Sequence, residues 1–90
     1  MIQYEIKISG RVQGVGFRYF VVQKVRETGI NGWVKNTVDG GVLVVAQGPE
    51  ADLKTFADYL RIGPTLSRID RITINKIQLP TVFDNFSVKY

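Results

Sequence analysis

The chain of 90 residues contains no cysteine and no histidine. Without them, a disulfide, a thiol nucleophile, a histidine general base and a transition-metal site are all excluded. Carboxylates remain, so composition alone does not exclude a bound Mg²⁺. No apolar run approaches the roughly 18 residues of a membrane span, and no basic-then-apolar signal segment opens the chain. We therefore expect a protein located in the cytoplasm that does not enter a membrane.

The remaining composition is ordinary for a single folded domain over residues 1–90. Hydrophobic residues make up 44% of the chain and charged residues 22%, which are typical proportions for a globular protein. A chain of this length buries one modest core and no second one. The formal net charge of +4 favours anionic partners, but it does not choose between a small phosphate ester and a nucleic acid.

Hydrophobic spacing predicts the order strand, helix, strand, strand, helix, strand, followed by a short extra strand near the end of the sequence. The expected strands are residues 2–9, 33–38, 42–46, 69–77 and 86–90. The expected helices run from Phe17 to a cap at Gly29 and from Glu50 to a stop at Gly63. Two strand–helix–strand units joined by a hairpin at residues 39–41 predict an α+β, ferredoxin-like βαββαβ two-layer sandwich. Its antiparallel sheet carries both helices on one face.

Side chains of the predicted elements divide into core and surface. We assign the large aromatic residues Phe17, Phe20, Trp33 and Phe56 to the core. We assign Lys24 and Arg26 to a solvated face of the first helix.

Residues 10–18 (GRVQGVGFR) join the first strand to the first helix and are the most informative stretch of the sequence. Three glycines within seven positions allow positive φ angles, so that successive N–H groups can point into one concavity. Such a concavity at a helix N-terminus binds anions. Arg18 lies in or near the first helical turn, where the helix dipole disfavours a cation. This placement suggests an external anion beside Arg18, and a phosphate fits best.

Chain geometry predicts that Asn36 returns to the same edge of the molecule. The helix from Arg18 to Thr28 descends about 16 Å at 1.5 Å per residue. The following strand rises by about 3.3 Å per residue, so that roughly five residues restore the height of the loop. The amide of Asn36 could hold a water beside a bound phosphate. Its neighbour Lys35 should point to the opposite face of the sheet.

Other phosphate-binding motifs fit this loop poorly. A Walker A loop ends in Gly-Lys-Ser/Thr, whereas Gly16 is followed here by Phe17 and Arg18. A Rossmann loop would need a glycine where Tyr19 stands, and a cysteine phosphatase loop would need a cysteine. Two alternatives stay open from the residues: an RNA-binding module with this sandwich fold, and a non-catalytic phosphate-binding module.

The two motifs resemble the signatures of the acylphosphatase family. Residues 10–18 followed by Tyr19 and Phe20 resemble the first signature, and residues 32–40 (GWVKNTVDG) resemble a G-W-V-x-N-x-x-D-G pattern. Residues 47–48 and the F-x-x-x-Y pattern of residues 86–90 also resemble family members, so the similarity spans about residues 6–90. One departure is Leu43, where many relatives carry a glutamate. This departure puts none of the implied catalytic roles in doubt.

The resemblance implies an enzyme that hydrolyses the carboxyl-phosphate bond of small acyl phosphates without a metal or cofactor. It implies that Arg18 binds the phosphate and Asn36 orients the attacking water. It also implies a monomer that takes phosphate or sulfate as a product-like ligand and binds no nucleic acid. The implied phosphate cradle consists of backbone amides of Gln13, Gly14, Val15, Gly16, Phe17 and Arg18.

Overall fold

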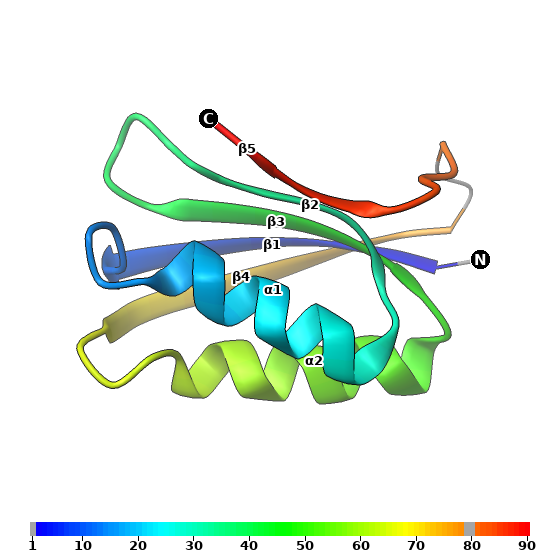
Figure 1. Ribbon diagram of the computed structural model, residues 1–90, viewed down its shortest axis with the longest axis horizontal. Coiled ribbons are helices and arrows are strands. Elements are labelled where there is room, and N and C mark those ends of the chain that lie inside the picture. The colour runs from blue at the N-terminus through cyan, green and yellow to red at the C-terminus, as the bar shows by residue number, and fades with distance from the viewer. Residues whose placement is uncertain (1, 79–80) are drawn as a thin grey trace.

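The computed structural model describes residues 2–78 and 81–90, which form one sheet layer and one helix layer (Figure 1). In chain order the elements are β1 (Ile2–Arg11), α1 (Phe17–Thr28), β2 (Asn31–Asn36), β3 (Val42–Gly48), α2 (Glu50–Ile62), β4 (Arg68–Ile77) and β5 (Phe86–Lys89). Both helices cover the same face of the sheet (Figure 1). The predicted element order and ferredoxin-like sandwich are confirmed. Within the described residues, no helix has the length and apolarity needed to cross a membrane.

The five strands lie in the order β4-β1-β3-β2-β5. The pairs among the first four are antiparallel, as predicted, whereas β5 pairs with β2 in parallel, so the complete sheet is mixed. The strand predicted at residues 33–38 begins and ends two residues earlier. It stops at Asn36 because the N–H of Thr37 already donates across the turn to the carbonyl of Gly41, 2.9 Å away.

The core fills the space between the sheet and the two helices. The face of α2 predicted to be apolar is buried as expected, and α1 buries Phe17, Val21 and Val25, which are spaced four residues apart. The largest fully buried side chains include Phe17, Phe56, Ile6, Ile8, Leu53 and Leu60. The two glycine-capped helices therefore dock on the sheet through one continuous apolar cluster.

Two assignments made from the sequence are wrong. Trp33 lies outside the core, because Val34 points into the core and successive residues of a strand face opposite sides. The indole packs on the open face, where Lys89 Nζ lies 4.5 Å from its ring centroid. Lys24 is not fully solvated, since its side chain is only 22% exposed. Its ammonium contacts the ring of Tyr59 at 4.5 Å and so links the two helices.

Polar side chains of the open face hold the segment that leads into β5. The side-chain amide of Asn31 donates to the carbonyl of Phe83 at 3.1 Å. The N–H of Phe83 donates to Gln47 Oε1 at 2.9 Å, and Gln47 Nε2 donates to the carbonyl of Thr81 and to Gln3 Oε1. Gln3 and Gln47 are buried, so these bonds satisfy groups that water does not reach. They fix the path of the chain into β5.

At Gly32 the backbone of β2 leaves no room for a side chain beside β3. Its φ is +140°, and a Cβ added there would lie 1.8 Å from the carbonyl oxygen of Val45. We predict that Gly32→Ala lowers the free energy of unfolding by about 3 kcal/mol, as measured by urea denaturation. Gly29→Ala is the matched control, because Gly29 also has a positive φ but no neighbour within 4 Å of an added Cβ. Its cost should be about 1 kcal/mol from backbone strain alone. Equal losses in both variants would contradict this account of Gly32.

Candidate active site

Buried side chains hold both ends of the loop between β1 and α1. Val12 is 1% exposed and Phe17 is 2% exposed, so both ends of the loop are fixed to the core. Between them, Gly14 and Gly16 adopt φ angles of +73° and +81°, in the left-handed region predicted from the sequence. Gly16 caps α1 without a side-chain hydrogen bond, and the first turn of α1 contains no acidic residue.

The backbone N–H groups of residues 13–19 belong to the loop and to the start of α1. Within residues 2–78 and 81–90, no carbonyl or side-chain oxygen accepts a hydrogen bond from any of them. The first pairing in the helix is the N–H of Phe20 with the carbonyl of Gly16, at 3.0 Å. A helix start with free N–H groups and no acid has the positive end of the helix dipole uncompensated. The loop is therefore suited to bind an anion.

The side chain of Gln13 ties this loop to the β2–β3 hairpin. Its Nε2 donates to the carbonyl of Thr37 at 2.7 Å and to the carbonyl of Gly41 at 2.8 Å. Both amide hydrogens are therefore used within the protein. Since these two carbonyls flank the hairpin turn just after Asn36, the bond pair sets the distance between the loop and that residue.

Asp39 shapes the same turn from the other side. Its carboxylate accepts from Thr37 Oγ1 and from the N–H of Gly41, and it pairs with Lys7 Nζ at 3.1 Å. These partners, led by the hydroxyl of Thr37 and followed by Lys7, lower the pKa of Asp39 from 3.8 to about 2. Asp39 is therefore ionised over the whole range in which the protein is expected to work. Asp39 therefore stabilises the turn, and the Asp39-Gly40 pair is a sequence pattern that favours turns.

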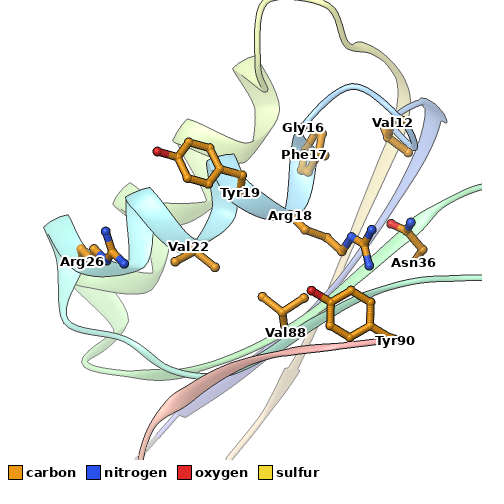
Figure 2. A pocket seen from close by; sticks show the side chains of 11 residues that line it. Val12, Gly16, Phe17, Arg18, Tyr19, Val22, Arg26, Asn36, Val88 and Tyr90 are labelled. Carbon is orange, nitrogen blue, oxygen red and sulfur yellow. The ribbon is translucent and has the colours of Figure 1, made fainter.

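Arg18 and Asn36 line one pocket beside the loop. The guanidinium of Arg18 reaches across from α1 and points toward the amide of Asn36 on β2 (Figure 2). Its Cζ lies 4.9 Å from the centroid of the Tyr90 ring, which stands below it. Within the part of the chain that the structure describes, the lining includes two arginines and no acidic side chain. The local charge thus favours an anion at the point where the guanidinium, the loop and the Asn36 amide meet.

The pocket is lined by five of the residues that the sequence proposed for the site: Gly14, Gly16, Phe17, Arg18 and Asn36. Gln13 and Val15 belong to the same loop but do not line the pocket, since the Gln13 side chain bonds to the hairpin and Val15 packs against the core. Lys35 faces away, with its ammonium 5.6 Å from the Trp33 ring. Sequence reasoning missed the clamp made by the Gln13 side chain and the contact of Tyr90 with Arg18. Neither has a local signal: each joins segments that become neighbours only in the complete sheet.

The comparisons with known proteins agree with this geometry. The sequence profile of the family described as Acylphosphatase matches residues 4–88. The chain belongs to the acylphosphatase family. It is 43% identical to the acylphosphatase of Bacillus velezensis over the full length of both chains. The crystal structure of acylphosphatase from Bacillus subtilis superposes with a TM-score of 0.97 at 40% identity, and all of both chains is covered.

The acylphosphatase fold also occurs inside a larger protein. Full-length HypF, solved in a phosphate- and nucleotide-bound form, matches all of this chain with 12% of its own length, at 30% identity and a TM-score of 0.89. The matches to acylphosphatases of about the same length as this chain, and not the match to part of a larger protein, indicate its activity. The chain is an acylphosphatase, a hydrolase that acts on acyl phosphates.

We predict that Gln13→Leu lowers both stability and turnover, although the Gln13 side chain is engaged away from the pocket. The variant loses two hydrogen bonds, while each carbonyl keeps one backbone N–H donor. The loss should cost about 2 kcal/mol in urea unfolding. Gln23→Leu, on the exposed face of α1, is the control and should leave both quantities nearly unchanged. A Gln13→Leu variant with the stability and turnover of the parent protein would refute the clamp.

We also predict that Asp39 contributes stability that depends on pH. Its pKa is about 2 in the folded protein against 3.8 for the free group. The contribution is therefore complete above pH 4 and is lost as the pH falls toward 2. Urea unfolding of the parent protein and of Asp39→Asn between pH 2 and pH 7 should show a gap in stability that closes at the acid end. A gap that stays constant with pH would argue against this ion pair.

Proposed function

We propose that this acylphosphatase holds the phosphoryl group of its substrate in the loop of residues 13–18, with Arg18 as the electrostatic clamp and Asn36 as the group that orients water. One observation carries the proposal: Gly14, Gly16 and Phe17, whose N–H groups have no acceptor within the described residues, line a single pocket with Arg18 and Asn36. Each supplies a different requirement of phosphoryl transfer, namely charge stabilisation, positioning and a placed nucleophile.

The roles follow from the chemistry of an acyl phosphate. Its leaving group is a carboxylate, a weak base that departs without a proton from a general acid. The enzyme must hold the phosphoryl oxygens and place a water in line with the bond that breaks. Preorganised N–H groups and a forked guanidinium stabilise the charge on the equatorial oxygens.

Asn36 acts by position and not by basicity. Its amide carries one acceptor and two donors, so it can hold a water but cannot remove a proton from it. Among the described residues, no acidic side chain lines the pocket, and we propose that the proton of the water passes to a phosphoryl oxygen of the substrate. A pH–rate profile with a limb due to an enzyme carboxylate would contradict this step.

The open face of the sheet gives the RNA-binding alternative little support. Modules of that class stack bases on aromatic residues of the two central strands. Here the central strands are β1 and β3, whose residues on that face include Glu5, Leu43 and Val45. The aromatic residue that does lie on this face, Trp33 of β2, already has the ammonium groups of Lys35 and Lys89 against its ring. The monomeric state, the cytoplasmic location and binding of phosphate or sulfate as product-like ligands stay predictions from the sequence.

We predict that Arg18→Ala and Asn36→Ala each lower kcat/KM for benzoyl phosphate by about 10²–10³. The measurement is release of phosphate in the presence of a chelator, with the fold checked by circular dichroism. Arg18→Lys keeps the charge but not the fork, so it should recover only part of the loss.

Arg61→Ala, on the exposed side of α2, is the matched control and should leave the rate unchanged. A folded Arg18→Ala or Asn36→Ala variant with the parent rate would overturn the assigned role of that residue. A rate that falls when the chelator is added would overturn the metal-free reaction.

A further inference from the structure

The pocket continues beyond the phosphate loop as a groove between α1 and β5. Arg18, Val22 and Arg26 are spaced four residues apart and therefore lie along one face of α1. The first and last of them are about 12 Å apart along the helix axis at 1.5 Å per residue. Val88 and Tyr90 form the opposite wall (Figure 2), and all five residues line the same pocket.

The pocket has more room than a phosphoryl group needs. Its volume, from the loop to Arg26, is about 380 Å³, which falls among the roughly 300–1,000 Å³ of small-molecule sites. Val22 and Val88 are half-buried and make its middle apolar. Arg18 stands at one end and Arg26 at the other (Figure 2). The groove therefore suits a ligand with an apolar centre and an anionic group at each end.

The charge of Arg26 has no partner within the part of the chain that the structure describes. No carboxylate of residues 2–78 or 81–90 lies within ion-pair distance of it, whereas its neighbours Lys24 and Glu27 pair with each other at 3.0 Å. A cation in the last turn of a helix is favoured by the helix dipole. The dipole accounts for a basic residue at this position, but not for its place in the wall of the groove.

The in-line geometry of the reaction places the acyl group in this groove. In an in-line displacement the attacking water and the leaving oxygen lie on opposite sides of phosphorus. Asn36 and Arg26 lie at opposite ends of the pocket, with the Arg18 guanidinium between Asn36 and Val22 (Figure 2). A water held by Asn36 therefore places the leaving acyl group on the side of Val22 and Arg26.

We propose that the groove between α1 and β5 binds the acyl group and that Arg26 selects acyl phosphates whose acyl chain carries a second anionic group. This inference rests on the proposed roles of Arg18 and Asn36. In the reaction, the water oxygen forms a bond to phosphorus as the bond between phosphorus and the acyl oxygen breaks. The products are inorganic phosphate, which keeps the proton, and a dicarboxylate when the second group is a carboxylate.

The test compares benzoyl phosphate, 4-carboxybenzoyl phosphate and 4-carbamoylbenzoyl phosphate. The para carboxylate cannot reach back to the acyl carbon, and the carbamoyl compound is its neutral counterpart of similar size. We would measure kcat and KM for the parent protein and for Arg26→Ala, Arg26→Lys and Arg71→Ala. Arg71 is an exposed residue of β4, at the opposite edge of the sheet from β5. Its variant removes the same charge as Arg26→Ala.

The parent protein should have a lower KM for the carboxy compound than for the carbamoyl compound. Arg26→Ala should raise KM for the carboxy compound about tenfold and leave its kcat unchanged, because a remote contact binds the ground state and the transition state alike. KM for the carbamoyl compound should stay within about twofold. Arg26→Lys should keep part of the preference, and Arg71→Ala should keep all of it.

Three results would overturn the inference. They are equal KM values for the two compounds in the parent protein, an equal rise in both KM values in Arg26→Ala, and the same selective loss in Arg71→Ala. A different result would show that the proposed function itself is wrong. In that case none of the three compounds would be hydrolysed, or Arg18→Ala would hydrolyse them all at the parent rate.

Discussion

The candidate site depends on the bond pair that joins Gln13 to the β2–β3 hairpin. Arg18 and the free N–H groups belong to one segment, and Asn36 belongs to another that is separated from it by the whole of α1. The amide of Gln13 spans the gap with hydrogen bonds of 2.7 and 2.8 Å to the carbonyls of Thr37 and Gly41. Asp39 and Lys7 then hold the turn that presents those carbonyls. On the proposed roles, positioning of the water relative to the phosphoryl group is therefore a property of this junction and not of Asn36 alone.

The site also carries an electrostatic cost. A helix start without an acid and with an arginine in its first turn is less stable than one that compensates its dipole, and α2 shows the alternative. There Glu50 stands at the positive end, accepting from Tyr4 and Lys76 at 2.9 and 3.0 Å, and these bonds lower its pKa. One helix uses its N-terminus for stability and the other leaves it free for a ligand. Both helices pack on the same apolar cluster, so this contrast lies in the first turn and not in the core.

The sequence was sufficient to predict the fold and the parts of the site that depend on local chemistry. Alternation along residues 2–9 and the helical spacing from Phe17 identified elements whose residues contact their own neighbours. The three glycines before Arg18 predicted positive φ angles that the backbone adopts. Trp33 was misassigned because hydrophobicity alone does not say which face of a two-sided strand a residue occupies, and Val34 takes the core side. The parallel pairing of β5, and with it the place of Val88 and Tyr90, depends on a crossover that leaves no periodic pattern in the sequence.

The edge position of β5 divides the pocket into two parts that differ in how they form. The loop between β1 and α1 follows an inner strand of the sheet and is anchored in the core by Val12 and Phe17. This loop should therefore persist as long as the core does. The far wall of the groove belongs to an edge strand of four residues, which pairs with β2 alone. Edge segments of this kind open locally at a small fraction of the global free energy of unfolding. The ability to bind phosphate should therefore arise early in folding and be lost last on heating, whereas discrimination among acyl groups should be acquired late and be the first property to disappear.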